Sequence, residues 1–219
     1  MTIRHHISEH LLLAHACAQL PEAFNLVVAT HLSLCDECRA RAGAFDALGG
    51  AVLDAGAAEK IADAAIDAAV ARITGCPRDV AGPPVRVRGG LPVPLADYVG
   101  GNLDAVRWRS VGMGVRQAIL PTQRTGSGRG ATARLLYIPA GAAMPEHGHG
   151  GLELTMVLHG AFVDQGRRYG PGDVEIADKA TQHTPVAEAQ ADCICLAAAD
   201  AKLRFSGLLP RLAQPFFRI

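Results

Sequence analysis

The first third of the chain has apolar residues at helical spacing. The clearest case is the segment 58–73, where Ile66, Val70 and Ile73 stand at i, i+4 and i+7 among polar and small residues. Ser8 is a suitable N-cap for an earlier segment, and the pair Gly49-Gly50 is expected to stop a later one. The pattern predicts four helices, over residues 8–19, 21–31, 36–48 and 58–73.

The second half of the chain changes to short alternating or wholly apolar runs separated by Gly and Pro, which is typical of strands. In the longest run, Leu154 and Met156 share one face of the strand, whereas Glu153 and Thr155 share the other. Such a strand separates an apolar side from a side that can carry chemistry. The predicted strands cover residues 133–138, 152–160, 172–177, 183–187 and 192–199.

A stretch rich in Pro and Gly lies between the two patterns. Five Pro and four Gly fall within residues 74–94, a density typical of a linker. We therefore predict a two-domain protein of α plus all-β class, with a small four-helix domain over 1–74, a linker over 75–94, and an antiparallel β domain over 95–219. Four short helices bury little apolar surface, so a metal or a partner is expected to add stability to the first domain.

Composition and charge limit the classes of protein to which the chain can belong. Hydrophobic residues make up 49% and charged residues 19% of the 219 residues, which argues against disorder. The 21 basic residues balance the 21 acidic ones, so no basic excess favours direct nucleic-acid binding. The net charge differs between the two parts of the chain, because residues 1–73 are acidic, with five Lys or Arg against nine Asp or Glu. No apolar run reaches the ~20 residues of a membrane span, and no signal-peptide pattern is present, so we expect a cytoplasmic protein with reduced cysteines.

The first cluster of candidate ligands is His31-Leu-Ser-Leu-Cys35-Asp-Glu-Cys38, an H-x3-C-x2-C pattern. His31 and Cys35 stand one helical turn apart, and the C-x2-C turn brings both sulfurs toward the same point, so three ligands suited to zinc converge. A closed tetrahedral site needs a fourth. The spacing leaves several donors open for that place, namely His5, His6, His10, His15 and Cys17.

The second cluster lies in the β domain. His147-Gly-His149 on an extended segment directs both imidazoles to the same side, and Glu153 follows after a turn at Gly150-Gly151. Nitrogen and carboxylate ligands of this kind suit zinc, iron, manganese, nickel or copper. Two further cysteines, Cys193 and Cys195, lie two apart in a predicted strand and face the same way, either as redox-sensing thiols near the metal or as buried small residues.

The spacing G-x5-H-x-H-x3-E-x6-G over 141–160 resembles the cupin superfamily, whose fold is a small β-barrel or jelly roll. A companion pattern over 172–187 keeps its histidine, although Asp178, Ala180 and Ala187 replace the usual Pro, Gly and Asn. The resemblance implies that His183 joins His147, His149 and Glu153 as a metal ligand.

The whole chain resembles the ChrR-type zinc anti-sigma factors, through MTIRHH, FNLVVATHLSLCDECRARAGA, GVRQAILPT, HTPVAE and RFSGLLPRLAQPFFRI. The resemblance implies that a zinc-binding N-terminal domain inhibits an extracytoplasmic-function (ECF) sigma factor as a 1:1 heterodimer. It also implies zinc ligands His6, His31, Cys35 and Cys38, a second zinc in the cupin-like domain, and release of the sigma factor in response to singlet oxygen or related oxidants. No catalytic residue is implied.

A metal-dependent enzyme is the competing hypothesis. Many cupins with three His and one Glu are dioxygenases or isomerases, and an open coordination position can bind oxygen or a small chelating substrate. The attached zinc-type helical domain has no catalytic purpose, and no acid/base pair beyond the ligands is evident. The sequence therefore favours a regulator over an enzyme.

Overall fold

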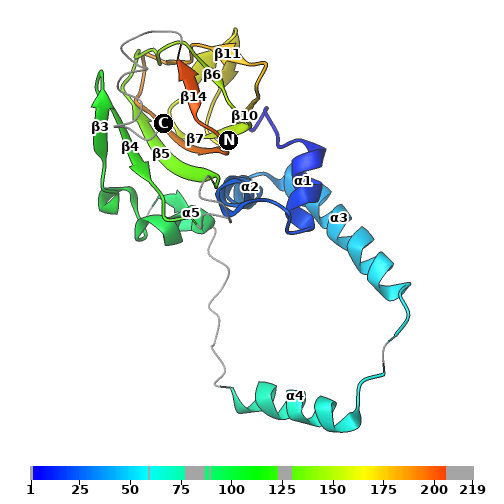
Figure 1. Ribbon diagram of the computed structural model, residues 1–219. Coiled ribbons are helices and arrows are strands. Elements are labelled where there is room, and N and C mark those ends of the chain that lie inside the picture. The colour runs from blue at the N-terminus through cyan, green and yellow to red at the C-terminus, as the bar shows by residue number, and fades with distance from the viewer. Residues whose placement is uncertain (1, 59, 77–86, 89, 123–129, 206–219) are drawn as a thin grey trace.

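The structure is a computed structural model, and it describes residues 2–58, 60–76, 87, 88, 90–122 and 130–205. The helical residues 9–34 lie on one side of a β structure formed by the second half of the chain, whereas the later helical residues before 76 extend away from it (Figure 1). The predicted combination of a helical N-terminal part and an antiparallel β part is confirmed. The C-terminal stretch over 206–219 that contributed to the family resemblance lies outside the described residues.

Four helices form before residue 76, as predicted. Ser8 caps the first one by accepting a hydrogen bond from the backbone N–H of Leu11 at 3.5 Å. Cys35 serves as C-cap of the second helix and N-cap of the third, so the chain turns sharply at a candidate ligand. The helices are α1 (Glu9–Ala16), α2 (Glu22–Leu34), α3 (Asp36–Asp54) and α4 (Asp63–Gly75).

Four predicted helix ends were wrong by three residues or more. Helix α2 continues past the predicted end at His31 to Leu34. Helix α1 ends before residue 19, because Ala18 adopts a left-handed φ of 53°. Helix α3 passes through Gly49-Gly50 to Asp54, since a glycine costs an exposed helix only about 1 kcal/mol and neither glycine is crowded. Helix α4 begins at Asp63 rather than at residue 58, with Asp63 in the first turn, where an acidic side chain suits the helix dipole.

The β part contains a six-stranded antiparallel sheet in the order β10-β7-β13-β5-β4-β3 and two three-stranded sheets, β11-β6-β14 and β12-β8-β9. The predicted strand over 183–187 divides into β11 and β12, which belong to different sheets, on either side of Thr184-Pro185. The strands are β3 (Arg109–Gly112), β4 (Val115–Ile119), β5 (Thr132–Ile138), β6 (His147–His149), β7 (Glu153–His159), β8 (Phe162–Asp164), β9 (Arg167–Tyr169), β10 (Val174–Ala177), β11 (Gln182–His183), β12 (Val186–Ala187), β13 (Cys193–Ala199) and β14 (Leu203–Phe205).

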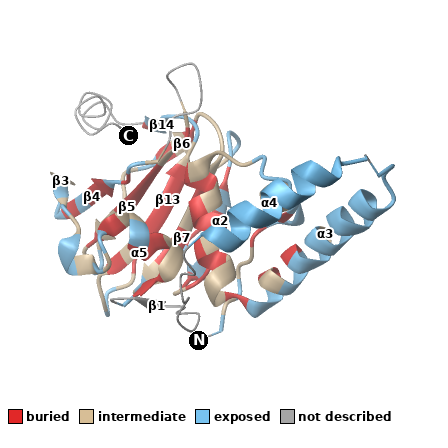
Figure 2. Cartoon of the chain, turned by 90° about the horizontal axis from the view of Figure 1, so that it is seen from below, coloured by how far each residue is buried: buried red, intermediate tan, exposed pale blue. Residues whose placement is uncertain are grey.

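The two faces of the six-stranded sheet have different roles. One face packs under α2, where Leu154, Met156 and Leu196 join Val27 and Val28 of the helix in a single hydrophobic core. The buried residues form a continuous band between sheet and helix in Figure 2. The opposite face encloses a cavity. The alternation predicted for β7 is therefore confirmed, and the helical and β parts share one core.

The last residues of the predicted linker form regular secondary structure. Leu91 is buried in the short strand β2 (Leu91–Pro92), which pairs with β1 (Val87–Arg88), and helix α5 (Val93–Val99) follows at once. Helix α5 packs against α2, and the Tyr98 hydroxyl donates a hydrogen bond to Glu22 Oε1 at 2.6 Å. The rest of the predicted linker, residues 77–86 and 89, lies outside the described residues.

Candidate metal centres

The first candidate centre forms where α2 meets α3. His31 lies in the last turn of α2, Cys35 caps both helices, and Cys38 lies in the first turn of α3. The backbone N–H of Cys38 donates to Cys35 Sγ at 3.4 Å, which folds the C-x2-C turn around the sulfur. His6 reaches the same point from the extended segment before α1. One ligand atom of each of the four residues lies within 4.8 Å of the others.

The distances at this centre fit a tetrahedral cation. His6 Nδ1 lies 3.4 Å from Cys35 Sγ and 3.5 Å from Cys38 Sγ. Metal–sulfur bonds of about 2.3 Å and metal–nitrogen bonds of about 2.0 Å at tetrahedral angles place N and S roughly 3.5 Å apart. The Nε2 atom of His31 is buried without a hydrogen-bond partner. A metal ion at the centre of the four residues would satisfy that atom.

Hydrogen bonds set the orientation of both histidines. His31 Nδ1 donates to the carbonyl oxygen of Gly172 at 2.9 Å, so its Nε2 carries the lone pair. His6 directs Nδ1 at the sulfurs while its Nε2 lies 3.4 Å from Glu37 Oε2. Metal-binding histidines commonly donate the other ring N–H to a carbonyl or a carboxylate in this way. Burial lowers the pKa of His31, which keeps the neutral, ligating form.

Burial raises the pKa of the Cys38 thiol to about 11, with Cys35 adding to the shift. Two buried sulfurs side by side resist ionisation unless a cation accompanies them, which again suits a metal. Among the described residues, the other donors left open by the sequence lie elsewhere. His5 Nε2 contacts the carbonyl oxygen of Arg168, His15 bonds to Asn25, His10 is exposed, and Cys17 is exposed.

The second candidate centre lies in the β part, where β6 and β11 pair. The register places His183 directly opposite His147, and His149 lies on the same side of β6 two residues further on. The Nε2 atoms converge, with His183 at 3.1 Å from His147 and 3.0 Å from His149. His147 Nδ1 donates to the carbonyl oxygen of Pro145 at 2.7 Å, and His183 Nδ1 donates to Asp164 Oδ2 at 3.0 Å.

With both rings neutral, these bonds make the Nε2 atoms of His147 and His183 acceptors, and two acceptors that face each other repel unless a cation lies between them. Three nitrogens around a tetrahedral metal stand about 3.3 Å apart, close to the observed spacing. The donor set therefore fits a metal ion.

Glu153 begins β7 after the turn at Gly150-Gly151, as predicted, but it is not part of the tight three-histidine group. Its Oε2 lies 3.6 Å from His149 Nδ1, and its Oε1 accepts a hydrogen bond from Thr155 at 3.2 Å. Burial opposes ionisation of this carboxyl, but the proximity of His149, with His147 and Arg134, outweighs burial and lowers the pKa of Glu153. Glu153 is therefore an anion beside the cluster, close enough to serve a bound metal.

Two buried carboxylates on the far side of His183 were not expected from the sequence. Asp164 on β8 lies 3.0 Å and Glu175 on β10 lies 3.8 Å from His183 Nδ1. Burial opposes protonation of His183, yet both carboxylates raise its pKa, Glu175 most strongly. Their signal in the sequence is weak: each is a single acidic residue in a strand, without ligand spacing.

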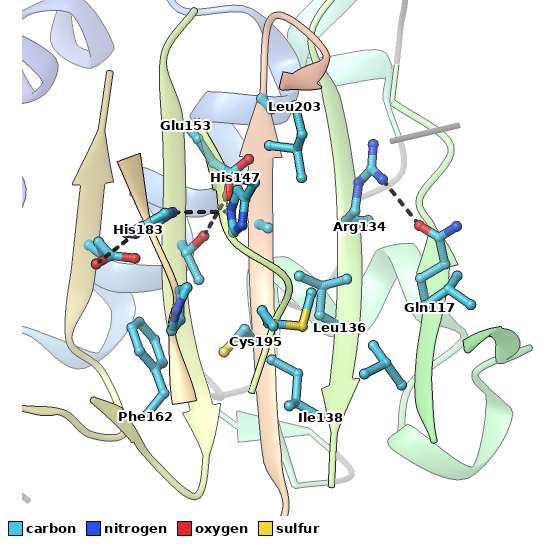
Figure 3. A pocket seen from close by; sticks show the side chains of 18 of the residues that line it. Gln117, Arg134, Leu136, Ile138, His147, Glu153, Phe162, His183, Cys195 and Leu203 are labelled. Atoms are coloured by element: carbon cyan, nitrogen blue, oxygen red, sulfur yellow. Dashed lines mark hydrogen bonds and ion pairs between the residues drawn. The ribbon is translucent and has the colours of Figure 1, made fainter. Parts of the chain in front are cut away.

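His147, His183 and Glu153 border a cavity of about 80 Å³ (Figure 3). Its other walls are mainly apolar, including Leu136, Ile138 and Phe162. The polar residues in these walls include Gln117, Thr155, Glu175 and Arg134. Arg134 carries the only guanidinium among the described residues that line the cavity. It is 8% exposed, and its guanidinium donates to Gln117 Oε1 at 3.1 Å. The cavity is large enough for a few water molecules or a very small ligand.

Cys193 and Cys195 are both buried, with their Sγ atoms 3.5 Å apart, and they are free thiols. Cys195 lines the same cavity as His147 and His183, whereas Cys193 is not among the lining residues. The neighbouring Cys193, followed by burial, raises the pKa of Cys195 well above its ordinary value. Cys195 therefore stays a protonated thiol at neutral pH, and protonated thiols are poor nucleophiles.

The fold and the two candidate centres define a two-part protein, in which a helical part with a His/Cys cluster is joined to a cupin-type β part. Residues 97–202 match the family described as the ChrR Cupin-like domain. Over its whole length the chain is 58% identical to the Anti-sigma-E factor ChrR of Cereibacter sphaeroides, all of which it covers. The chain belongs to the ChrR family of anti-sigma factors. The predicted regulatory class is confirmed, and the family is named for sigma-factor control rather than for a reaction.

A solved relative gives the same result at the level of structure. The crystal structure of Rhodobacter sphaeroides SigE in complex with the anti-sigma ChrR matches with a TM-score of 0.77 and 55% identity. The match covers 90% of this chain and 99% of that one. No helix in the described part of the chain has both the length and the hydrophobicity that a membrane crossing requires.

Proposed function

We propose that this protein is an anti-sigma factor that binds an ECF sigma factor as a 1:1 heterodimer and thereby restrains transcription. The relative in the solved complex, at 55% identity, is bound to SigE. The sigma factor works on RNA polymerase, so the proposed location is the cytoplasm. The helical part, residues 1–74, is the proposed sigma-binding domain, and residues 95–219 form the proposed sensor domain.

The observation that carries this proposal is the apolar surface on α4 and on the second half of α3. None of the residues of α4 is buried, although Ile66, Val70 and Ile73 stand 47%, 52% and 74% exposed. On α3, Val52 and Leu53 are 68% and 79% exposed. Both helices extend away from the shared core in Figure 1. A helix with an apolar stripe and no intramolecular partner is suited to a groove on another protein.

The test is titration of the full chain with SigE of Rhodobacter sphaeroides, followed by size-exclusion chromatography. We expect a 1:1 complex. Val70→Asp places a charge in the proposed interface and should weaken binding at least tenfold, because a desolvated unpaired charge costs about 2 kcal/mol or more. The matched control is Ile119→Asp, at a residue of β4 with 39% exposure, which should bind like the wild type. Equal binding by both variants contradicts the assigned surface, and no complex at all contradicts the function.

We further propose that zinc fills both centres. Two thiolates and two imidazoles form a closed set that favours zinc, and four protein ligands leave no open position, so this centre is structural. The ligands proposed for it are His6, His31, Cys35 and Cys38, and those for the second centre are His147, His149, Glu153 and His183. Metal analysis of the purified chain should give two zinc ions. His147→Ala together with His149→Ala should leave one, and Cys35→Ser should also leave one.

The proposed signal is singlet oxygen or a related oxidant that reaches the second centre through the cavity. Cys193 and Cys195 are candidate redox residues, because Cys195 lines that cavity. Cys195→Ser removes the thiol and keeps the size of the side chain. If the thiol takes part, oxidant-induced release of the sigma factor should be slower in this variant, whereas unchanged release would leave the metal ligands as the sensing groups.

A further inference from the structure

Four consecutive residues of the β part touch both candidate centres. The carbonyl oxygen of Gly172 accepts the hydrogen bond from His31 Nδ1 at 2.9 Å. Three residues later, Glu175 Oε1 lies 3.8 Å from His183 Nδ1. Residues 172–175, which are the two residues before β10 and its first two residues, therefore run from a ligand of the first centre to a ligand of the second. Strand β10 is an edge strand of the six-stranded sheet, so one side of its backbone faces the N-terminal segment.

Asp173 fixes the chain that carries His6. Its Oδ1 accepts hydrogen bonds from the backbone N–H groups of Arg4, at 2.6 Å, and of His5, at 2.9 Å. Its Oδ2 accepts from the backbone N–H of Gly170 at 2.8 Å, and the residue is only 3% exposed. The backbone N–H of Val174 donates in turn to the carbonyl oxygen of His5 at 3.1 Å.

These contacts matter because His6 lies outside any helix. His31, Cys35 and Cys38 are placed by the junction of α2 and α3, whereas the extended segment before Ser8 has no local structure to hold it. A carboxylate that accepts two backbone N–H groups immediately before His6 supplies that rigidity. Charge-assisted hydrogen bonds of this kind are about twice as strong as neutral ones.

We infer that the β part completes the first metal centre, with Asp173 as the positioning residue for His6 and the Gly172 carbonyl as the positioning group for His31. Residues 172–175 then link the two centres, so that the state of the second centre alters how tightly the first holds its metal. The inference rests on the ligand sets in the proposed function. It does not depend on sigma binding, and it assigns the β part a direct role in the helical centre.

The test measures the rate at which zinc leaves the first centre to a chromogenic chelator, in full chains that also carry His147→Ala and His149→Ala so that only one zinc is counted. Asp173→Asn keeps the size of the side chain but replaces an acceptor oxygen by an NH₂ group and removes the charge. We expect zinc release to be at least tenfold faster. The matched control is Asp192→Asn, because Asp192 Oδ1 also accepts a backbone N–H, that of Ala140, at 2.9 Å, outside both candidate centres.

A second pair of variants acts from the other side of the contact and leaves the β part unchanged. Arg4→Pro removes one of the N–H groups that Asp173 accepts, whereas Arg4→Ala removes only the exposed side chain. Arg4→Pro should speed zinc release and Arg4→Ala should not. Emission of the single tryptophan, Trp108, reports whether the β part stays folded. If Asp173→Asn and Arg4→Pro release zinc no faster than their controls while Trp108 emission is unchanged, the positioning role is overturned.

The link between the centres is tested with the same chelator on chains whose second centre is intact, where the release phase that Cys35→Ser removes is assigned to the first centre. His147→Ala with His149→Ala should change the rate of zinc release from the first centre about fivefold or more, which is the low end of typical coupling between sites. In chains that also carry Asp173→Asn, the ratio of the two release rates, with the second centre destroyed and intact, should be close to one. A ratio of one in the wild-type background refutes the link. Sigma binding is measured separately on the same proteins, so failure of the coupling and failure of the anti-sigma function give different results.

Discussion

Leu135 on β5 lies in the core that the helices share with the sheet, and no part of its side chain is exposed. Replacement by alanine leaves a cavity under α2. Measured losses for buried Leu→Ala changes are about 2 to 5 kcal/mol. Because Val27 and Val28 of α2 belong to the same core, the free energy of unfolding of α2 should fall together with that of the sheet.

Two probes follow the two sides of this interface during urea unfolding. Trp108 is the only tryptophan, and it packs against the shared core, so its fluorescence reports the β part. Hydrogen exchange of the α2 amides, Glu22–Leu34, reports the helix. With a slope of about 2 kcal/mol per molar urea, Leu135→Ala should lower both midpoints by about 1 to 2.5 M.

The control is Leu48→Ala on α3, where the leucine is 60% exposed and a change within about 0.5 kcal/mol is expected. The result that would refute the reasoning is specific. If Leu135→Ala lowered the midpoint of the Trp108 transition and left the exchange of α2 unchanged, the helix and the sheet would be independent units and the shared core would not couple them.

Two further predictions concern the fold. Tyr98→Phe should lower the free energy of unfolding by about 1 kcal/mol at pH 7, because the hydroxyl donates a hydrogen bond to Glu22. That bond, then burial, raises the pKa of Tyr98 from 10.0 to about 12. The loss in free energy of unfolding caused by Tyr98→Phe, measured with urea, should therefore shrink as the pH rises from 10 to 12. A loss that does not depend on pH would contradict the assignment. Gly160→Ala should cost about 3 kcal/mol or more, because φ is +67° and the new Cβ would overlap the carbonyl oxygen of Asp192. Gly166→Ala, with φ of +76° in open space, should cost only about 1 kcal/mol by thermal unfolding, and equal losses would contradict the steric argument.

The sequence predicted most of what local spacing determines. His31, Cys35 and Cys38 fall within eight residues at one helix junction, and the alternation of residue types along β7 is enough to separate its core face from its cavity face. His183 required the companion pattern of the cupin resemblance, because the register of β11 on β6 brings it to His147 across 36 residues. Spacing along the chain carries no information about such a pairing.

The groups that surround the ligands were not predictable. Asp164, Asp173 and Glu175 are single acidic residues in or beside strands, and such residues are usually exposed. Each is buried here because the sheets fold it against a partner far away in sequence, and the bond from His31 to Gly172 joins residues 141 apart. Outer-sphere groups of metal sites are set by tertiary packing. A ligand pattern can therefore be found without the residues that orient it.

The shared core also limits how a signal can reach the proposed sigma-binding surface on α3 and α4. Swinging the helices away from the β part on the Pro/Gly-rich segment would expose side chains that are fully buried, among them Leu135, Leu154, Met156 and Leu196. At about 1.5 to 3 kcal/mol each, these four alone approach the whole stability of a typical domain. Helix α4 and the second half of α3 have no such anchor, since the buried residues of α3 end at Ala42. A signal that moves the proposed sigma-binding helices at modest energetic cost therefore acts on α3 and α4, while α1 and α2 remain packed on the sheet. The contacts of residues 172–175 with the first centre belong to the part that does not move.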